Sequence, residues 1–332
     1  MTDPDEEGSP TPDTRHPTPD TRHPPVNTEH RTLNTGYSLL RVWYLAARPK
    51  TLWAAVAPVM IGTAMAYGDG GFHALAAVAA LLGALLIQIG TNFCNDYADF
   101  KKGADTEARI GPMRVTQAGL VTPEAMLRAT VLVFALATCI GIYLVVRGGW
   151  PMFWIAVLSV VAGVAYTAGP YALAYLGLGE VFVLIFFGPV AVGGTYYVQT
   201  GQWPWYVTVA GIAPGLLSCA ILAVNNLRDV EQDLVANKRT LAVRFGKRFA
   251  RAEYLACVLG AVPLIPLILW QGFCKSPFLL LSILCLAAGL QPIRTVWERV
   301  EGAALNPVLG QTARLLLLYA LLFTVGWIAG TL

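Results

Sequence analysis

The chain has 332 residues, of which 56% are hydrophobic and 13% are charged, and its net charge is +3. A soluble protein carries about 25% charged residues, so this composition excludes an ordinary soluble enzyme and places most of the chain in lipid. The small net charge gives no reason to expect a nucleic-acid partner. None of the six cysteines forms a CxxC pair and most lie in apolar runs, which indicates packing residues, with no disulfide framework and no zinc site.

Residues 1–36 differ in composition from the rest of the chain. They are polar, and they carry the heptad Thr-Pro-Asp-Thr-Arg-His-Pro at 11–17 and again at 18–24. Such a segment buries too little apolar surface to offset its conformational entropy, so we expect a disordered tail. Residues 37–332 are then expected to form one transmembrane domain.

Apolar stretches long enough to cross a bilayer, which takes roughly 20 residues, recur through the remainder of the chain. We predict nine spans, at 51–68, 73–95, 125–146, 150–168, 178–199, 204–225, 250–271, 276–291 and 313–331. None shows the period-two alternation of a membrane barrel. The predicted fold class is therefore all-α, a polytopic helical bundle.

Basic residues are distributed unevenly between the loops. They gather before the first span and after the second, sixth and eighth, whereas the opposite side has only Arg147 and Lys275. The positive-inside rule then puts the N-terminus and the even-numbered loops in the cytoplasm, for a multi-pass protein of the plasma (cytoplasmic) membrane. The long charged loops 96–124 and 226–249 fall on that same face.

Two of the predicted spans end in a stripe of Asn and Asp. On a helix, Asn92, Asp96 and Asp99 fall within about 60° of one another. The sixth span ends in the same way. Its stripe consists of Asn225, Asp229 and Asp233. Because a carboxylate at the centre of a lipid-facing helix costs about 2.5–3.5 kcal/mol, these side chains should face a wet cavity or the interface.

Each stripe leads into a loop that is rich in cations. The candidate phosphate-binding residues in these loops are Lys102, Arg109, Arg114, Arg228, Lys238 and Arg239. Mg²⁺ prefers oxygen ligands and often binds through one or two carboxylates together with substrate phosphates, and basic side chains take the remaining phosphate oxygens. A single stripe is explained most simply by solvated charges at a helix end. Two stripes with the same spacing on one face instead favour a diphosphate site with Mg²⁺ as cofactor.

At these residues the sequence resembles the UbiA superfamily of intramembrane aromatic prenyltransferases, from about Arg48 to the C-terminus. Within it the chain is most similar to the branch that acts on 1,4-dihydroxy-2-naphthoate in menaquinone synthesis. The motifs that carry this resemblance are Arg48-Pro-Lys-Thr51, Asn95-Asp96-Tyr-Ala-Asp99, Arg109-Ile-Gly-Pro-Met-Arg114, Gly177-Leu-Gly-Glu180 and Asn225-Asn-Leu-Arg-Asp229. Some relatives have a Lys four residues after a Tyr at the end of the fourth span, where this chain has Pro170 after Tyr166.

The resemblance implies transfer of a polyprenyl group from polyprenyl diphosphate to 1,4-dihydroxy-2-naphthoate, with loss of CO₂ and formation of a demethylmenaquinol. The catalytic and metal-binding residues would be Asn92, Asp96, Asp99, Asn225, Asp229 and Asp233. The weaker candidates for acceptor or prenyl contacts are Arg48, Lys50, Tyr166, Glu180, Phe187, Tyr196 and Tyr197. Each of these has an ordinary alternative as a juxtamembrane anchor, a helix-terminal charge or a packing residue.

Three alternatives remain open. A sister prenyltransferase with another phenolic acceptor or a phytyl donor would share both motifs. An ion-coupled transporter also uses intramembrane Asp residues and related halves, although its sites lie near the midplane. A CDP-alcohol phosphotransferase would carry one dense Asp-Gly-x2-Ala-Arg motif, which is absent here.

Overall fold

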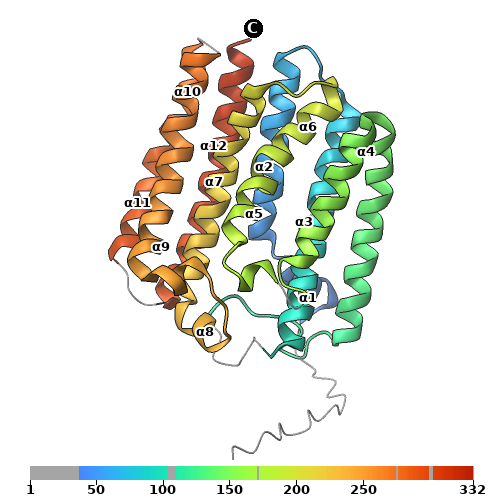
Figure 1. Cartoon of the computed structure of the whole chain (residues 1–332), viewed down its shortest axis with the longest axis vertical. Coiled ribbons are helices and arrows are strands. Elements are labelled where there is room, and N and C mark those ends of the chain that lie inside the picture. Colours follow the sequence, from blue (N-terminus) through green and yellow to red (C-terminus); the bar gives the residue numbers. More distant parts are fainter. Residues whose placement is uncertain (1–36, 104–109, 170–171, 274–275, 299–301, 332) are drawn as a thin grey trace, which may run out of the picture. The chain divides into compact units, whose positions relative to one another are not determined.

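A computed structural model describes residues 37–103, 110–169, 172–273, 276–298 and 302–331. The tail predicted for residues 1–36 lies outside these ranges. Residues 35–332 form one compact unit, and its described part consists of helices and connecting turns without strands (Figure 1). The prediction of an all-α membrane bundle is confirmed.

Twelve α-helices are connected by short turns and 3₁₀ or π segments in the described ranges. The α-helices are α1 (Leu39–Ala47), α2 (Pro49–Gly68), α3 (Ala74–Lys101), α4 (Pro123–Ala165), α5 (Gly179–Ile185), α6 (Ala191–Thr200), α7 (Trp205–Arg228), α8 (Val230–Val235), α9 (Leu241–Leu259), α10 (Ile265–Gly272), α11 (Cys285–Glu298) and α12 (Asn306–Ala329). The other segments are η1 (Leu173–Tyr175), η2 (Phe186–Val190), η3 (Gly260–Leu264), η4 (Pro277–Leu284) and η5 (Gly302–Leu305).

Eight of the described helical stretches are long and apolar enough to span a membrane, where the sequence predicts nine spans. The difference lies in α4, whose 43 residues would extend about 65 Å as one straight helix, twice the thickness of the hydrocarbon core. Gly149 interrupts it with φ 67° and ψ −155°, and α4 folds back on itself at this point (Figure 1). The two halves of α4 therefore correspond to the predicted spans 125–146 and 150–168.

The C-terminal ends of α3 and α7 lie at the same end of the bundle, the end where α1 and α8 are found (Figure 1). Helix α3 stops where Gly103 takes a left-handed conformation, with φ 63°. Helix α7 stops at Asp229, whose φ of −98° and ψ of 10° turn the chain into α8. The predicted Asn/Asp stripes therefore reach one end of the molecule, as the sequence indicates.

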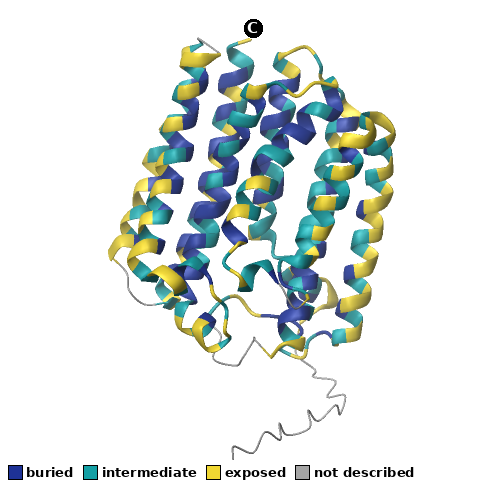
Figure 2. Cartoon of the chain, viewed as in Figure 1, coloured by how far each residue is buried: buried dark blue, intermediate teal, exposed yellow. Residues whose placement is uncertain are grey.

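Helix α7 is the most buried of the spanning helices and forms the centre of the bundle, whereas the outer helices expose one face (Figure 2). Small residues let it approach η2 closely. A Cβ on Gly211 would lie 2.7 Å from Cα of Pro189, and one on Gly215 would lie 2.5 Å from the carbonyl oxygen of Leu184. Such contacts require glycine, as at other close helix crossings in membranes. This packing fixes the position of η2 and the aromatic residues on it.

Candidate active site

A cavity of 1220 Å³ opens between α2, α3, α4, the α5–α6 segment and α7. Its wall is mainly apolar, but polar side chains from the ends of α3 and α7 line it as well. The acidic residues among the lining residues are Asp99, Glu180, Asp229 and Asp233, and the basic ones are Arg48, Lys50, Arg114 and Lys238. The cavity therefore combines a large apolar volume with clustered charges of both signs.

The first stripe reaches the cavity through Asn92, Asn95 and Asp99. Asp96 is directed elsewhere. Its carboxylate accepts hydrogen bonds from the backbone N–H groups of Val115 and Thr116, both at 3.2 Å. Asp96 lies about 100° around α3 from Asn95, because successive residues turn by about 100°. Of the predicted stripe, Asn92 and Asp99 line the cavity together with Asn95, whereas Asp96 is not among the lining residues. The role of Asp96 as a metal ligand stays a prediction.

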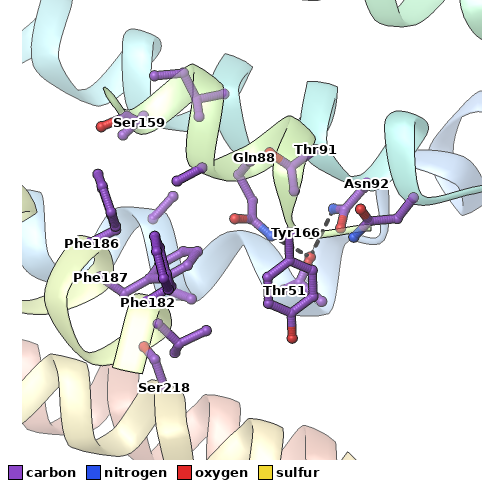
Figure 3. Close-up of a pocket in the computed structure, with 18 of the residues that line it drawn as sticks. Thr51, Gln88, Thr91, Asn92, Ser159, Tyr166, Phe182, Phe186, Phe187 and Ser218 are labelled. Carbon is purple, nitrogen blue, oxygen red and sulfur yellow. Dashed lines mark hydrogen bonds between the residues drawn. The ribbon is translucent and has the colours of Figure 1, made fainter. Parts of the chain in front are cut away.

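Asn92 connects α3 to the corner between α1 and α2. Its amide donates to the carbonyl oxygen of Ala47 at 2.9 Å and to Oγ1 of Thr51 at 3.0 Å (Figure 3). Between these acceptors lies Arg48, which has a left-handed φ of 51°. Non-glycine residues adopt this conformation only when the surroundings hold it. Asn92 thus stabilises the corner that brings Arg48 and Lys50 to the cavity wall.

Asp99 is the point where the two motifs meet. Nη2 of Arg114 lies 2.8 Å from Oδ2 of Asp99, and Nζ of Lys238 lies 3.8 Å from its Oδ1. The hydroxyl of Tyr175 donates to Oδ1 at 3.4 Å. Arg114 follows the first stripe in the sequence and Lys238 follows the second, so the fold brings the two predicted basic loops to one carboxylate.

The second stripe reaches the cavity with all three predicted residues, Asn225, Asp229 and Asp233. Arg228 holds two of them in place. Its guanidinium donates from Nε and Nη2 to the two oxygens of Asp229 at 2.7 and 2.6 Å, and Nη2 also donates to Oδ1 of Asn225 at 2.8 Å. Nη1 donates to Asn306 at 3.0 Å, and the side chain is fully buried. All three nitrogens of Arg228 therefore have protein partners, which does not favour its predicted role as a phosphate ligand.

The remaining predicted phosphate ligands separate into two groups. Arg114 and Lys238 line the cavity, whereas Lys102 and Arg239 are not among its lining residues. Nζ of Lys102 donates to the carbonyl oxygens of Thr167 at 2.6 Å and Gly169 at 3.2 Å, and burial lowers the pKa of Lys102. Arg239 is exposed to solvent. Arg109 lies outside the described residues.

Aromatic side chains form the wall that faces the polar residues of α3. Phe182, Phe186 and Phe187 gather on this wall, opposite Thr51 and Asn92 (Figure 3). The rings of Phe182 and Phe186 are stacked, with 6.1 Å between centroids. Electron-rich ring faces can stabilise a nearby cation by about 0.5–2 kcal/mol each. The prediction that Phe187 faces the substrate volume thus agrees with its position.

Tyr166 also lines the cavity. Tyr196 and Tyr197 do not line it. The hydroxyl of Tyr196 donates to Asp69 at 2.7 Å, and that of Tyr197 donates to the carbonyl oxygen of Gly148 at 3.1 Å. Asp69 ends α2 and Gly148 precedes the fold-back in α4, both at the opposite end of the bundle. Contact of Tyr196 and Tyr197 with the prenyl group stays a prediction, which these positions do not favour.

Glu180 begins α5 at the cavity wall, where Asn226 of α7 donates to its Oε1 at 2.7 Å. Further polar residues line the cavity that were not predicted as site residues from the sequence, among them Asn95, Asn226 and Gln232. A signal was present for Asn95, which lies three residues after Asn92 and so shares its helix face. For Asn226, the doubled Asn in the second motif was the available sign.

The model of the UbiA prenyltransferase family matches residues 55–318 of this chain. The chain belongs to that family. It is 36% identical to the 1,4-dihydroxy-2-naphthoate octaprenyltransferase of Haemophilus influenzae over 87% of this chain and 96% of the relative. The protein of the same name from Escherichia coli is 36% identical over 86% and 94%. A 2-carboxy-1,4-naphthoquinone phytyltransferase of a Synechocystis strain is 30% identical over 63% and 67%.

Solved structures of the family share the fold. A UbiA homologue from Archaeoglobus fulgidus aligns with a TM-score of 0.61 and 16% identity, over 86% of this chain and 99% of that one. The same homologue has also been solved bound to geranyl diphosphate (GPP) and Mg²⁺. At 16% identity, this similarity shows that the chain and the homologue share an arrangement of helices.

Proposed function

We propose that this protein transfers a polyprenyl group from polyprenyl diphosphate to 1,4-dihydroxy-2-naphthoate, with loss of CO₂, to give a demethylmenaquinol. The observation that carries the proposal is the meeting of two Asn/Asp-bearing helix ends beside one large apolar cavity. Relatives that share 36% of their residues with this chain over most of its length are named for this acceptor and an octaprenyl group. A phytyl donor is the minor alternative, because the Synechocystis relative, 30% identical, is named a phytyltransferase.

The residues at the polar part of the cavity suit Mg²⁺ in type, because carboxylate and amide oxygens are the ligands that this ion prefers. They are Asn92, Asn95, Asp99, Asn225, Asp229 and Asp233. Within the described ranges, no group of three or more His, Cys, Asp or Glu side chains is arranged to enclose a metal. We therefore infer that these residues share the ion with the donor phosphates. When bound, Mg²⁺ supplies positive charge that neutralises the departing diphosphate.

The chain's own residues then have distinct roles. Arg114 and Lys238 hold phosphate oxygens, and the phenylalanine wall receives the first isoprene unit as the bond from its C1 to oxygen breaks. The ring carbon that carries the carboxylate forms the new bond to C1. Loss of the acceptor carboxylate as CO₂ returns an electron pair to the ring, so no strong base is required. Arg48 and Lys50 supply the cations that orient this carboxylate.

The membrane setting follows from the substrates. A polyprenyl chain stays in the apolar part of the cavity or in lipid while its diphosphate reaches the charged end. We place this charged end at the cytoplasmic side of the plasma membrane, together with the N-terminus, because the basic loops gather there.

The test is an assay of the full-length protein in lipid with 1,4-dihydroxy-2-naphthoate, octaprenyl diphosphate and Mg²⁺, read by mass spectrometry. A prenylated, decarboxylated product should appear, EDTA should remove it, and Asp99→Asn and Asp229→Asn should each lower its yield strongly at the same Mg²⁺ concentration. Glu124→Gln, an exposed acid at the start of α4, is the matched control and should behave as wild type. A product formed only with another phenol or with phytyl diphosphate would reassign the substrate. No release of diphosphate from any prenyl donor would refute the enzyme and favour a transporter.

A further inference from the structure

Tyr175, at the end of η1, lies beside two lysines that come from different motifs. Nζ of Lys102 lies 4.4 Å from the centre of its ring, and Nζ of Lys238 lies 5.0 Å from it. Both distances are within the range of about 6 Å in which a cation interacts with an aromatic face. One ring thus contacts a cation from the end of α3 and a cation from the loop after α8.

The segment that carries Tyr175 is attached to both motifs. Its backbone carbonyl accepts a hydrogen bond from the N–H of Arg239 at 3.0 Å, and the carbonyl of Leu176 accepts from Nη2 of Arg244 at 2.8 Å. On the other side, Lys102 donates to the carbonyl oxygen of Thr167. These contacts hold the Tyr175 ring in a fixed position between the two loops.

Only one of the two lysines reaches the substrate volume. Lys238 lines the cavity, whereas Tyr175 and Lys102 are absent from its lining residues. Two ammonium groups near one another repel, so their placement here requires compensation. The face of the Tyr175 ring and the carboxylate of Asp99 provide it, since Asp99 lies 3.8 Å from Lys238 and accepts from the Tyr175 hydroxyl.

We propose that Tyr175 is a positioning residue for the donor diphosphate, with a ring that holds the ammonium of Lys238 at the cavity wall where phosphate oxygens bind. Lys102 contacts the same ring outside the cavity and need not touch the substrate. This inference rests on the proposed function, in which the donor is a prenyl diphosphate. The ring acts through its electron-rich face, so the hydroxyl group is dispensable.

The experiment measures the Kd of geranyl diphosphate in the presence of Mg²⁺ by calorimetry on the full-length protein in detergent. Tyr175→Phe should bind within twofold of wild type. Tyr175→Leu should bind about tenfold more weakly, the size expected from the loss of aromatic contacts to cations. The KM for the naphthoate acceptor should not change in either variant. Tyr97→Leu is the matched control, because Lys101 lies 5.9 Å from the Tyr97 ring outside the cavity, and its Kd should equal that of wild type.

Two further measurements separate positioning from folding. Phenylalanines with increasing numbers of fluorine atoms at position 175 keep the shape of the ring but weaken its face, so the Kd should rise stepwise with fluorination. In a Lys238→Met background, Tyr175→Leu should weaken binding by less than twofold. A Kd independent of fluorination, or a full tenfold loss in the Lys238→Met background, would overturn the inference. Failure of the wild-type protein to bind geranyl diphosphate would instead refute the proposed function.

Discussion

The two carboxylates of the first motif, Asp96 and Asp99, differ in what they contact, although only two residues lie between them. Asp99 lines the cavity beside Arg114, whereas Asp96 accepts two backbone N–H groups of the following loop. A carboxylate bound to backbone amides stabilises a loop, and one at a cavity wall is available to a cation. The two residues should therefore respond differently to substitution.

We expect Asp99→Asn to raise the Mg²⁺ concentration needed for half-maximal turnover by about tenfold or more, which equals a loss of about 1.4 kcal/mol in binding. Asp96→Asn keeps one acceptor oxygen and should lower thermal stability while leaving the Mg²⁺ requirement unchanged. Titration of activity with Mg²⁺ and a melting curve for each variant distinguish the two roles. An equal shift of the Mg²⁺ requirement in both variants would return Asp96 to the metal site.

Arg228 gives the second prediction at this scale. Its removal leaves the carboxylate of Asp229 buried without its bidentate partner, and breaking a buried pair in this way costs about 3–5 kcal/mol. Arg228→Met should therefore lower the free energy of unfolding by about this amount in an SDS titration of the solubilised protein. The exposed Arg248→Met is the comparison and should be neutral. Wild-type stability of Arg228→Met would show that Asp229 does not depend on this contact.

The sequence predicted the residue types of the site better than their direction. Spacing identified both stripes, but a helix turns by about 100° per residue and the cavity occupies one side, so spacing alone did not show that Asn95 lines the cavity while Asp96 contacts the following loop. Tyr196 and Tyr197 do not line the cavity, and the predicted span 178–199 already placed them at its far end. The partners of Arg228 could not be predicted, because Asn306 lies 78 residues away in the sequence.

Among the helices, α4 depends on one residue for its topology. Gly149 has φ 67° and ψ −155°, a region that is essentially restricted to glycine and costs other residues about 1–3 kcal/mol. The space around it is open, since an added Cβ would meet only Pro151, at 4.0 Å. The cost of a substitution there would therefore be conformational, without a steric clash.

Gly149→Ala should lower the free energy of unfolding by about 1–3 kcal/mol and leave the KM values unchanged, because the turn lies at the end of the bundle opposite the charged motifs. Gly141→Ala is its matched control, since Gly141 lies within α4 with no atom within 4 Å of an added Cβ. Because alanine has a higher helix propensity than glycine, Gly141→Ala should be as stable as wild type or more stable. The two variants are compared by thermal melting in the same detergent. A Gly149→Ala variant as stable as wild type would contradict backbone strain at position 149.

The sequence predicted both halves of α4 and the short connection between them, at 147–149. The Arg147-Gly-Gly-Trp150 stretch separates two apolar runs, and Gly and Pro near a helix end are ordinary signs of a turn. The close approach of η2 to α7 was harder to predict. It depends on pairs such as Gly188 and Gly211, which are 23 residues apart. The sequence around a single glycine in an apolar span does not indicate which residue it will contact.

At the scale of the whole molecule, the family match and the described bundle both begin after the polar tail. We expect removal of residues 1–34 to leave kcat and both KM values within about twofold of wild type, because the cavity is built from residues beyond position 43. Assays of the truncated and full-length proteins in the same lipid test this. A large loss of turnover after truncation would give the tail a role in catalysis.

The pairing of Asp99 with Arg114 and of Asp229 with Arg228 has a consequence for the resting protein. Asp99 and Asp229 each already have a counter-charge within the chain, so the ligand-free state needs no bound cation to offset the repulsion between these two carboxylates. The melting temperature without substrate should therefore be the same in EDTA and in Mg²⁺, while turnover stops in EDTA. The protein would then be stable in the membrane without metal, and the ion would bind and dissociate together with each diphosphate.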